Sequence, residues 1–186
     1  MSETLEEHEH VEHAAESGRR YSALLIAALA AGLAFTEQGA QHAHTRMSAS
    51  AITAADLWAQ YQAKSIRANE ARDLAKAVAV TAPAGADRDR AVAAMQADAD
   101  RFEHDGSTGK SAIAAQAKAS EAERDAAHER LEAFDNAAAA LQLAIVLTTA
   151  SVITGSMMLV GAGFLLGLLG GALGILGLIR PEWAAW

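Results

Sequence analysis

The feature that most constrains the fold is a long stretch without charge. From Asn136 to Ile179 the sequence contains no Asp, Glu, Lys, Arg or His. A bilayer crossing takes about twenty apolar residues, so this run of more than forty residues is long enough for two crossings. Gly155-Ser156 provides turn-forming residues near its middle. The sequence therefore predicts a hairpin of two transmembrane helices, 136–154 and 157–179.

A shorter apolar run near the N-terminus predicts a third transmembrane helix over residues 19–38. Its apolar centre, Tyr21 to Phe35, follows Arg19-Arg20, and tilt with flanking residues extends it across a bilayer. The long acidic region in front of it, residues 1–18, argues against a cleaved signal peptide.

The position of the paired arginines also predicts an orientation. Basic residues beside a first crossing favour the cytoplasmic side, so we expect the N-terminus in the cytoplasm. In a multi-pass protein of a bacterial inner membrane, residues 39–135 would then lie in the periplasm. The chain would end in a tail, residues 180–186, whose Trp183 and Trp186 suit the membrane interface.

Residues 39–135 are predicted to form a water-facing helical domain. Alanine is abundant, and the breaks fall at Pro83 with Gly85 and at Asp105 to Gly109, which predicts helices at about 41–80, 87–103 and 110–136. Large apolar residues are too few for a conventional core. The expected fold class is therefore all-α, with three transmembrane helices and a hairpin or coiled-coil domain that gains burial from neighbouring copies.

Charge and cysteine content exclude several kinds of partner and site. The formal net charge of −8 argues against nucleic acid, which requires clustered Lys and Arg. The chain has no cysteine, so it has neither disulfides nor thiolate metal ligands. No nucleophile elbow, phosphate-binding loop or dinucleotide fingerprint is present, and we expect no enzyme activity and no cofactor.

The most distinctive segment runs from Asp56 to Arg67, with the sequence DLWAQYQAKSIR. A Trp, a Tyr-Gln and a Lys-Ser-Ile shortly after a first membrane helix resemble the bacterial family called domain of unknown function 4337. The resemblance covers nearly the whole chain, although its specificity rests on this motif, and the His-rich N-terminus departs from the family pattern. It implies the same topology and no known activity.

Five residues of this segment form a candidate interface motif: Trp58, Tyr61, Gln62, Lys64 and Ser65. On a helix, Trp58, Tyr61 and Ser65 share one face. The first interpretation is packing and hydrogen bonding between helices. The alternative is a docking or oligomer contact, because Trp and Tyr are common interface anchors.

The acidic N-terminal arm is a candidate for weak divalent metal binding. Its candidate ligands are His8, Glu9, His10 and His13, of which Glu9 and His13, or His10 and His13, share a helix face. The alternative is a solvated arm whose histidines titrate near neutral pH.

Glycines and two polar residues suggest roles within the membrane. Small residues at every fourth position allow close approach of membrane helices. Two such series overlap in the sequence, and they predict helix packing or oligomer contacts at Gly163, Gly167, Gly170, Gly171 and Gly174. Glu37, just past the first crossing, and Gln142, within the second, are candidate pore residues if several copies surround an axis.

The leading hypothesis from the sequence is a non-enzymatic, self-assembling membrane scaffold, or an accessory subunit of a larger membrane complex. Its partners would be membrane lipid and further copies of the chain. An oligomeric ion channel or small-solute transporter is the first alternative. A metal-binding membrane protein that uses the N-terminal arm is the second.

Overall fold

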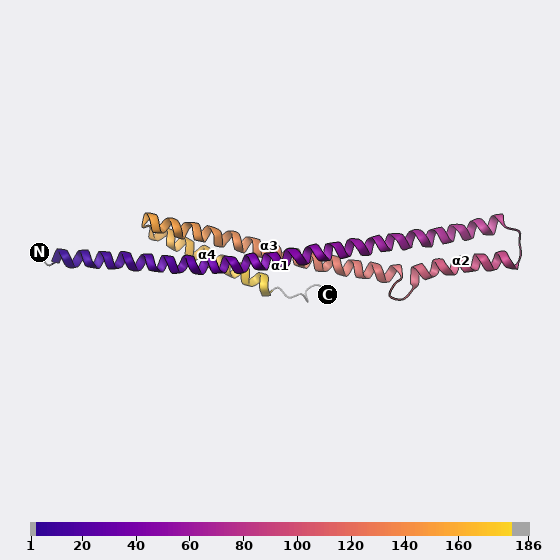
Figure 1. Cartoon of the computed structure of the whole chain (residues 1–186), viewed down its shortest axis with the longest axis horizontal. Coiled ribbons are helices and arrows are strands. Elements are labelled where there is room, and N and C mark those ends of the chain that lie inside the picture. The colour runs from indigo at the N-terminus through magenta and orange to yellow at the C-terminus, as the bar shows by residue number, and fades with distance from the viewer. Residues whose placement is uncertain (1–2, 180–186) are drawn as a thin grey trace. The chain divides into compact units, whose positions relative to one another are not determined.

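The computed structural model describes the backbone of residues 3–179 and the side chains of residues 20–179. Its elements are α1 (Glu3–Thr81), α2 (Ala86–His104), α3 (Lys110–Thr154) and α4 (Met157–Ile179) (Figure 1). The described residues contain no strand, so the predicted all-α class is confirmed. The tail, with Trp183 and Trp186, lies outside the described residues.

Each interruption between helices contains proline or glycine. After α1, Pro83 has no N–H to donate, and Gly85 precedes α2. After α2, Gly106 has a φ of +40°, and a Cβ at Gly109 would lie 2.8 Å from the backbone nitrogen of Asp105. After α3, Gly155 has a φ of +69°, a conformation that favours glycine.

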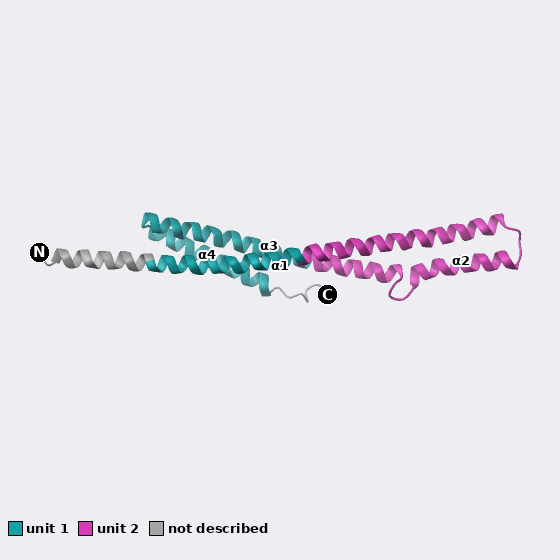
Figure 2. Cartoon of the chain, in the orientation of Figure 1, with its two compact units in different colours: residues 1–45, 126–186 teal, residues 46–125 magenta. Residues whose placement is uncertain are grey.

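The chain divides into two compact units (Figure 2). Unit 1 comprises residues 1–45 and 126–186, so it contains the first part of α1, the second part of α3 and all of α4. Unit 2 comprises residues 46–125, which include the rest of α1, α2 and the start of α3.

Unit 2 buries mainly alanine. Among its buried apolar residues only Ile113 is larger, and the others are Ala54, Ala68, Ala75, Ala99 and Ala117. Ala54, Ala68 and Ala75 lie at multiples of seven residues along α1, and so they fall on nearly one line of that helix. Small side chains on such a line let helices approach closely. Three large apolar residues of α1, Ile52, Ile66 and Leu74, are more than half exposed in this chain.

Unit 1 packs α1, α3 and α4 around a small apolar cluster. Leu29 of α1 lies with Leu141 and Ala144 of α3, and partly buried side chains surround them, namely Leu25, Leu33, Ile145 and Leu166. Buried hydroxyls in this unit bond to backbone carbonyls of their own helix: Thr148 Oγ1 donates to the carbonyl of Ala144 at 2.8 Å. Thr148 is fully buried, so this bond satisfies a donor that water cannot reach.

Three of the four helices have the length and composition needed to cross a membrane. They are α1, in its part from Arg20, α3 and α4. The 23 residues of α4 extend about 35 Å, compared with a hydrocarbon thickness of about 30 Å. Within their apolar segments these helices expose large apolar side chains, including Leu24, Val146 and Leu168.

Candidate functional site

The distinctive segment of the sequence lies on α1 in unit 2, where it faces α3. Trp58 Nε1 donates a hydrogen bond of 2.9 Å to Glu121 Oε1. The Tyr61 ring packs edge-on against Trp58, with ring centroids 5.5 Å apart and an interplanar angle of 78°. Three residues apart on a helix, the two aromatic side chains share one face. This face joins α1 to α3 by both apolar contact and a charge-assisted hydrogen bond.

Lys110, the first residue of α3, connects the aromatic pair to a second set of charges. Its ammonium lies 5.1 Å from the centroid of the Tyr61 ring, within the range of a cation–π interaction. The same Nζ donates to Glu103 Oε1 at 3.2 Å. The lysine side chain is only 14% exposed, so these two partners compensate much of its lost hydration.

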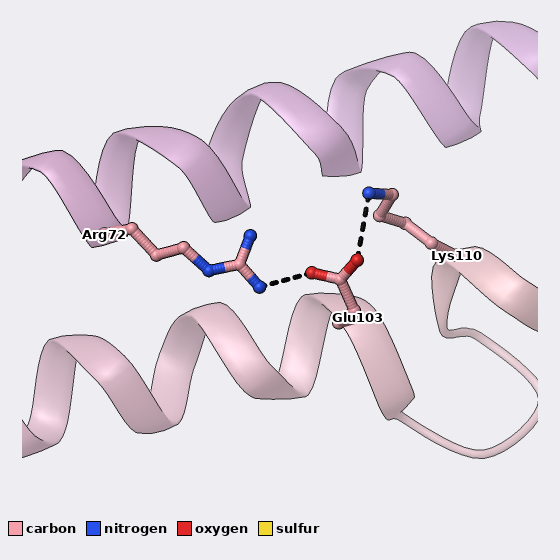
Figure 3. A network of polar contacts seen from close by, with 3 residues as sticks. All are labelled: Arg72, Glu103 and Lys110. Atoms are coloured by element: carbon pink, nitrogen blue, oxygen red, sulfur yellow. Dashed lines mark hydrogen bonds and ion pairs between the residues drawn. The ribbon is translucent and has the colours of Figure 1, made fainter.

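Glu103, near the end of α2, is the centre of a three-residue network (Figure 3). One carboxylate oxygen accepts from Arg72 of α1 and the other from Lys110 of α3. The hydrogen bond from Arg72, followed by that from Lys110, lowers the pKa of Glu103 below its ordinary value. The hydrogen bond to Glu103 raises the pKa of Arg72. One carboxylate thus connects all three helices of unit 2.

Lys64 of the motif contacts the turn between α2 and α3, where its Nζ donates to the carbonyl of Thr108. Ser65 is partly buried and Gln62 is exposed. Three of the five motif residues, Trp58, Tyr61 and Lys64, therefore contact other residues of the same chain. Any role of the motif in docking a partner stays a prediction.

Four residues of this site were not predicted from the sequence. Lys110 and Glu121 contact the motif, and Arg72 and Glu103 complete the network at Lys110. Carboxylates interspersed with Arg and Lys are expected on any exposed helix surface, so their pattern does not distinguish these four. One available signal was position: Glu103 and Lys110 flank a turn whose Gly106 and Gly109 bring the ends of α2 and α3 together. Such a location favours a short-range ion pair.

We expect Trp58→Phe to destabilise unit 2 by at least about 1 kcal/mol, since a smaller aromatic ring takes the place of the indole and the hydrogen bond to Glu121 is lost. Glu121→Gln is the matched control, because its amide oxygen still accepts from the indole. The stability of both variants is measured by chemical denaturation of the full chain in detergent, and the local effect by hydrogen exchange of peptides from α1 and α3. Equal exchange in Trp58→Phe and the wild type would contradict a stabilising role for this bond.

We expect the network at Glu103 to give unit 2 a pH dependence at the acidic end. Because the folded pKa of Glu103 is lower than its ordinary value of 4.5, its contribution is fully present above about pH 4.5. It is lost as the pH falls through the folded pKa. Glu103→Gln removes the charge, so amide exchange in α2 should exceed that of the wild type at pH 7, and the difference should shrink as Glu103 becomes protonated. A difference that is constant with pH would contradict an ionic role.

Most of the candidate glycines of α4 face α1 or α3 within unit 1. A Cβ at Gly163 would overlap Thr148 Oγ1 and lie 3.0 Å from the carbonyl oxygen of Ala144. The other close neighbours belong to Leu29 for Gly167, to Leu141 for Gly170 and to Thr36 for Gly174. Gly171 differs, because a Cβ there would meet no atom within 4 Å.

The two candidate pore residues are exposed. Glu37 lies on α1 and Gln142 on α3, and no hydrogen bond or ion pair joins them within the described part of the chain. Next to Glu37, Gln38 Nε2 and His42 Nε2 are 2.9 Å apart, one turn from each other on α1. The side-chain contact just beyond the first apolar run is therefore one between an amide and an imidazole.

The candidate metal ligands His8, Glu9, His10 and His13 lie outside the residues whose side chains are described. Among residues 20–179, no group of three or more potential ligands is placed to hold a metal ion. Metal binding by the arm stays a prediction.

Comparison with known proteins agrees with the motif. No curated protein and no solved structure matches the chain. A family described as "Domain of unknown function (DUF4337)" matches residues 19–180. This match begins at the first candidate membrane span, includes the Trp58–Tyr61 pair and ends just after α4. The chain therefore belongs to the family of domain of unknown function 4337.

Proposed function

We propose that this chain is an integral membrane protein that crosses the bilayer three times, through residues 19–38 of α1, residues 136–154 of α3, and α4. The supporting observation is the surface of unit 1, whose exposed side chains along these segments are predominantly apolar. On α4 alone they include Phe164, Leu165, Leu168, Ile175 and Leu176. A continuous apolar surface of this kind is stable in hydrocarbon and unfavourable in water.

The proposed location is a bacterial inner membrane, with the N-terminus in the cytoplasm and unit 2 in the periplasm. The absence of native cysteine allows a direct test with single-cysteine variants. Gln62→Cys in unit 2 should react with an impermeant maleimide in intact cells. Met157→Cys, at the exposed turn between α3 and α4, should react only after permeabilisation. The reverse labelling pattern would overturn the orientation.

Its proposed role is non-enzymatic: a scaffold that assembles with copies of itself, or an accessory subunit in a larger membrane complex. The observation behind this role is the uncovered apolar side of α1 in unit 2. Ile52 and Ile66, two heptads apart, and Leu74 stay exposed although the helix packs closely through its alanine line. Trp58, Arg72, Glu103 and Lys110 instead form contacts that join the helices of this unit to one another.

The native mass of the protein in mild detergent, with every co-purifying protein identified, tests this role. We expect a defined homo-oligomer. A stoichiometric foreign subunit would support the accessory role. A strictly monomeric protein with a folded unit 2 and no partner would overturn both.

Two further measurements separate the alternatives proposed from the sequence. Ion flux through liposomes containing the oligomer, lost in Glu37→Ala and Gln142→Ala, would replace the scaffold with a channel. Calorimetric binding of Zn²⁺ to the full chain, lost when residues 1–18 are deleted, would assign metal binding to the arm. We expect impermeant liposomes and equal weak heats.

A further inference from the structure

Gln142 is exceptional on the apolar surface of unit 1. Between Ala137 and Ile153 of α3, the only exposed polar side chains are Gln142 and Thr149. The Thr149 hydroxyl donates to the carbonyl of Ile145 at 2.8 Å and is satisfied within its own helix. The Gln142 amide has no hydrogen-bond partner in the described part of the chain.

The position of Gln142 makes this unpaired amide unfavourable. It lies six residues, or about 9 Å, beyond Asn136, where the uncharged run of α3 begins. A side chain with two methylenes does not reach across that distance to water. An amide left without hydrogen bonds in an apolar medium is unfavourable, because it has lost its bonds to water and gained none in return. A partner that offers both a donor and an acceptor would remove this cost.

The residues around Gln142 form a regular stripe on the exposed side of α3. Its members are Ala139, Gln142, Val146, Thr149 and Ile153, all of them exposed, at alternating intervals of three and four residues. This is the spacing at which one helix meets another along a heptad seam. The opposite side of α3 carries the residues buried inside unit 1, including Leu141, Ala144 and Thr148. Thus one side of α3 packs inside unit 1, and the opposite side, which carries the stripe, is exposed.

We propose that this stripe of α3 is the contact between two copies of the chain in the membrane, and that the two Gln142 amides hydrogen-bond to each other. The proposal rests on the self-assembly proposed above and assigns it a surface. Gly163, Gly170 and Gly174 of α4 already contact side chains of their own chain, so their face is covered. The α3 stripe is exposed.

Symmetry favours a second copy as the occupant. Copies of one protein insert with the same orientation, so their α3 helices run parallel, and a twofold axis along the membrane normal brings equivalent residues together. Gln142 then meets Gln142. A primary amide carries both donors and acceptors and is complementary to itself. A single polar residue in an apolar seam also fixes register and oligomeric state.

The first test measures dimerisation of the full chain in liposomes by energy transfer between labelled copies. Gln142→Leu should raise the dissociation constant roughly tenfold, since hydrogen bonds between membrane helices contribute about 1–2 kcal/mol in model peptides. Gln142→Asn keeps a primary amide and should retain most of the affinity. Thr149→Val removes a hydroxyl that bonds its own helix and should leave the affinity unchanged. An unchanged dissociation constant in Gln142→Leu would overturn the proposal.

The second test locates the contact by oxidative cross-linking of single cysteines. Dimers should form through cysteines at positions 139 and 146 of α3, which leave Gln142 in place, and not through cysteines at Leu165 or Leu168, which are exposed on α4. A stable oligomer that cross-links through α4 would leave self-assembly intact and refute the α3 contact. A protein that is monomeric throughout would refute both proposals.

Discussion

Replacing Gly163 by alanine is expected to destabilise unit 1 by about 1–3 kcal/mol, the usual cost of an added methyl in a close-packed contact. The new Cβ would overlap Thr148 Oγ1, and the carbonyl of Ala144 behind it is backbone that yields little. Thr148 itself is fully buried and bonded to that carbonyl, so it has no open position to rotate into. The methyl can be accommodated only by moving α4 away from α3.

Gly171→Ala is the matched control, because it adds the same methyl to the same helix at a position with no atom within 4 Å. Any change in helix propensity is common to both variants, and their difference isolates the contact between helices. The measurement is unfolding of the full chain in mixed micelles with increasing dodecyl sulfate, followed by far-ultraviolet circular dichroism. Equal midpoints for the two variants would show that Gly163 is not in close contact with α3.

The contrast between Gly163 and Gly171 shows what a periodic pattern leaves undetermined. An interval of four residues places Gly163, Gly167 and Gly171 near one line along the helix. Because an α-helix has 3.6 residues per turn, each step of four also rotates this line slightly around the helix axis. Within α4 the buried glycines are Gly163, Gly170, Gly174 and Gly177. Which of two overlapping faces turns inward depends on where α1 and α3 lie, which the sequence of α4 does not contain.

The helical class of the chain is, by contrast, evident in local chemistry. Proline and glycine mark the ends of the helices, and the alanine-rich intervals contain nothing that favours another backbone conformation. The Glu103 network could not be predicted in this way, because its pairing depends on the register of α1 against α2 and α3. The exposure of Ile66 and Leu74 has the same origin: an α1 face that looks available for packing is turned away from both neighbours.

Phe134 gives the largest single effect that we expect in unit 1. Its side chain is 6% exposed and lies between Gly39 of α1 and Gly177 of α4. A methyl group added at Gly39 would approach the ring to 2.7 Å, and one added at Gly177 would approach it to 3.2 Å. Phe134→Ala should therefore cost about 3–5 kcal/mol, as large-to-small substitutions of buried aromatic residues do. Unfolding in mixed micelles measures the loss.

A double-mutant cycle with Gly39 tests whether this contact is direct. Gly39→Ala alone should cost about 1–3 kcal/mol, because its methyl meets the ring. In the Phe134→Ala background the ring is absent and the methyl occupies part of the cavity, so the same change should cost little or stabilise the protein. The coupling between the two sites should then exceed about 1 kcal/mol.

Gly32→Ala is the control for the cycle, because its methyl would lie 3.7 Å from Leu141, an ordinary packing distance, and would not touch Phe134. Its effect should add to that of Phe134→Ala without coupling. Additive effects at Gly39 as well would mean that α1 and α3 do not meet through Phe134. Strong coupling at Gly39 alone would place α1 and α3 in direct contact at the ends of their apolar segments.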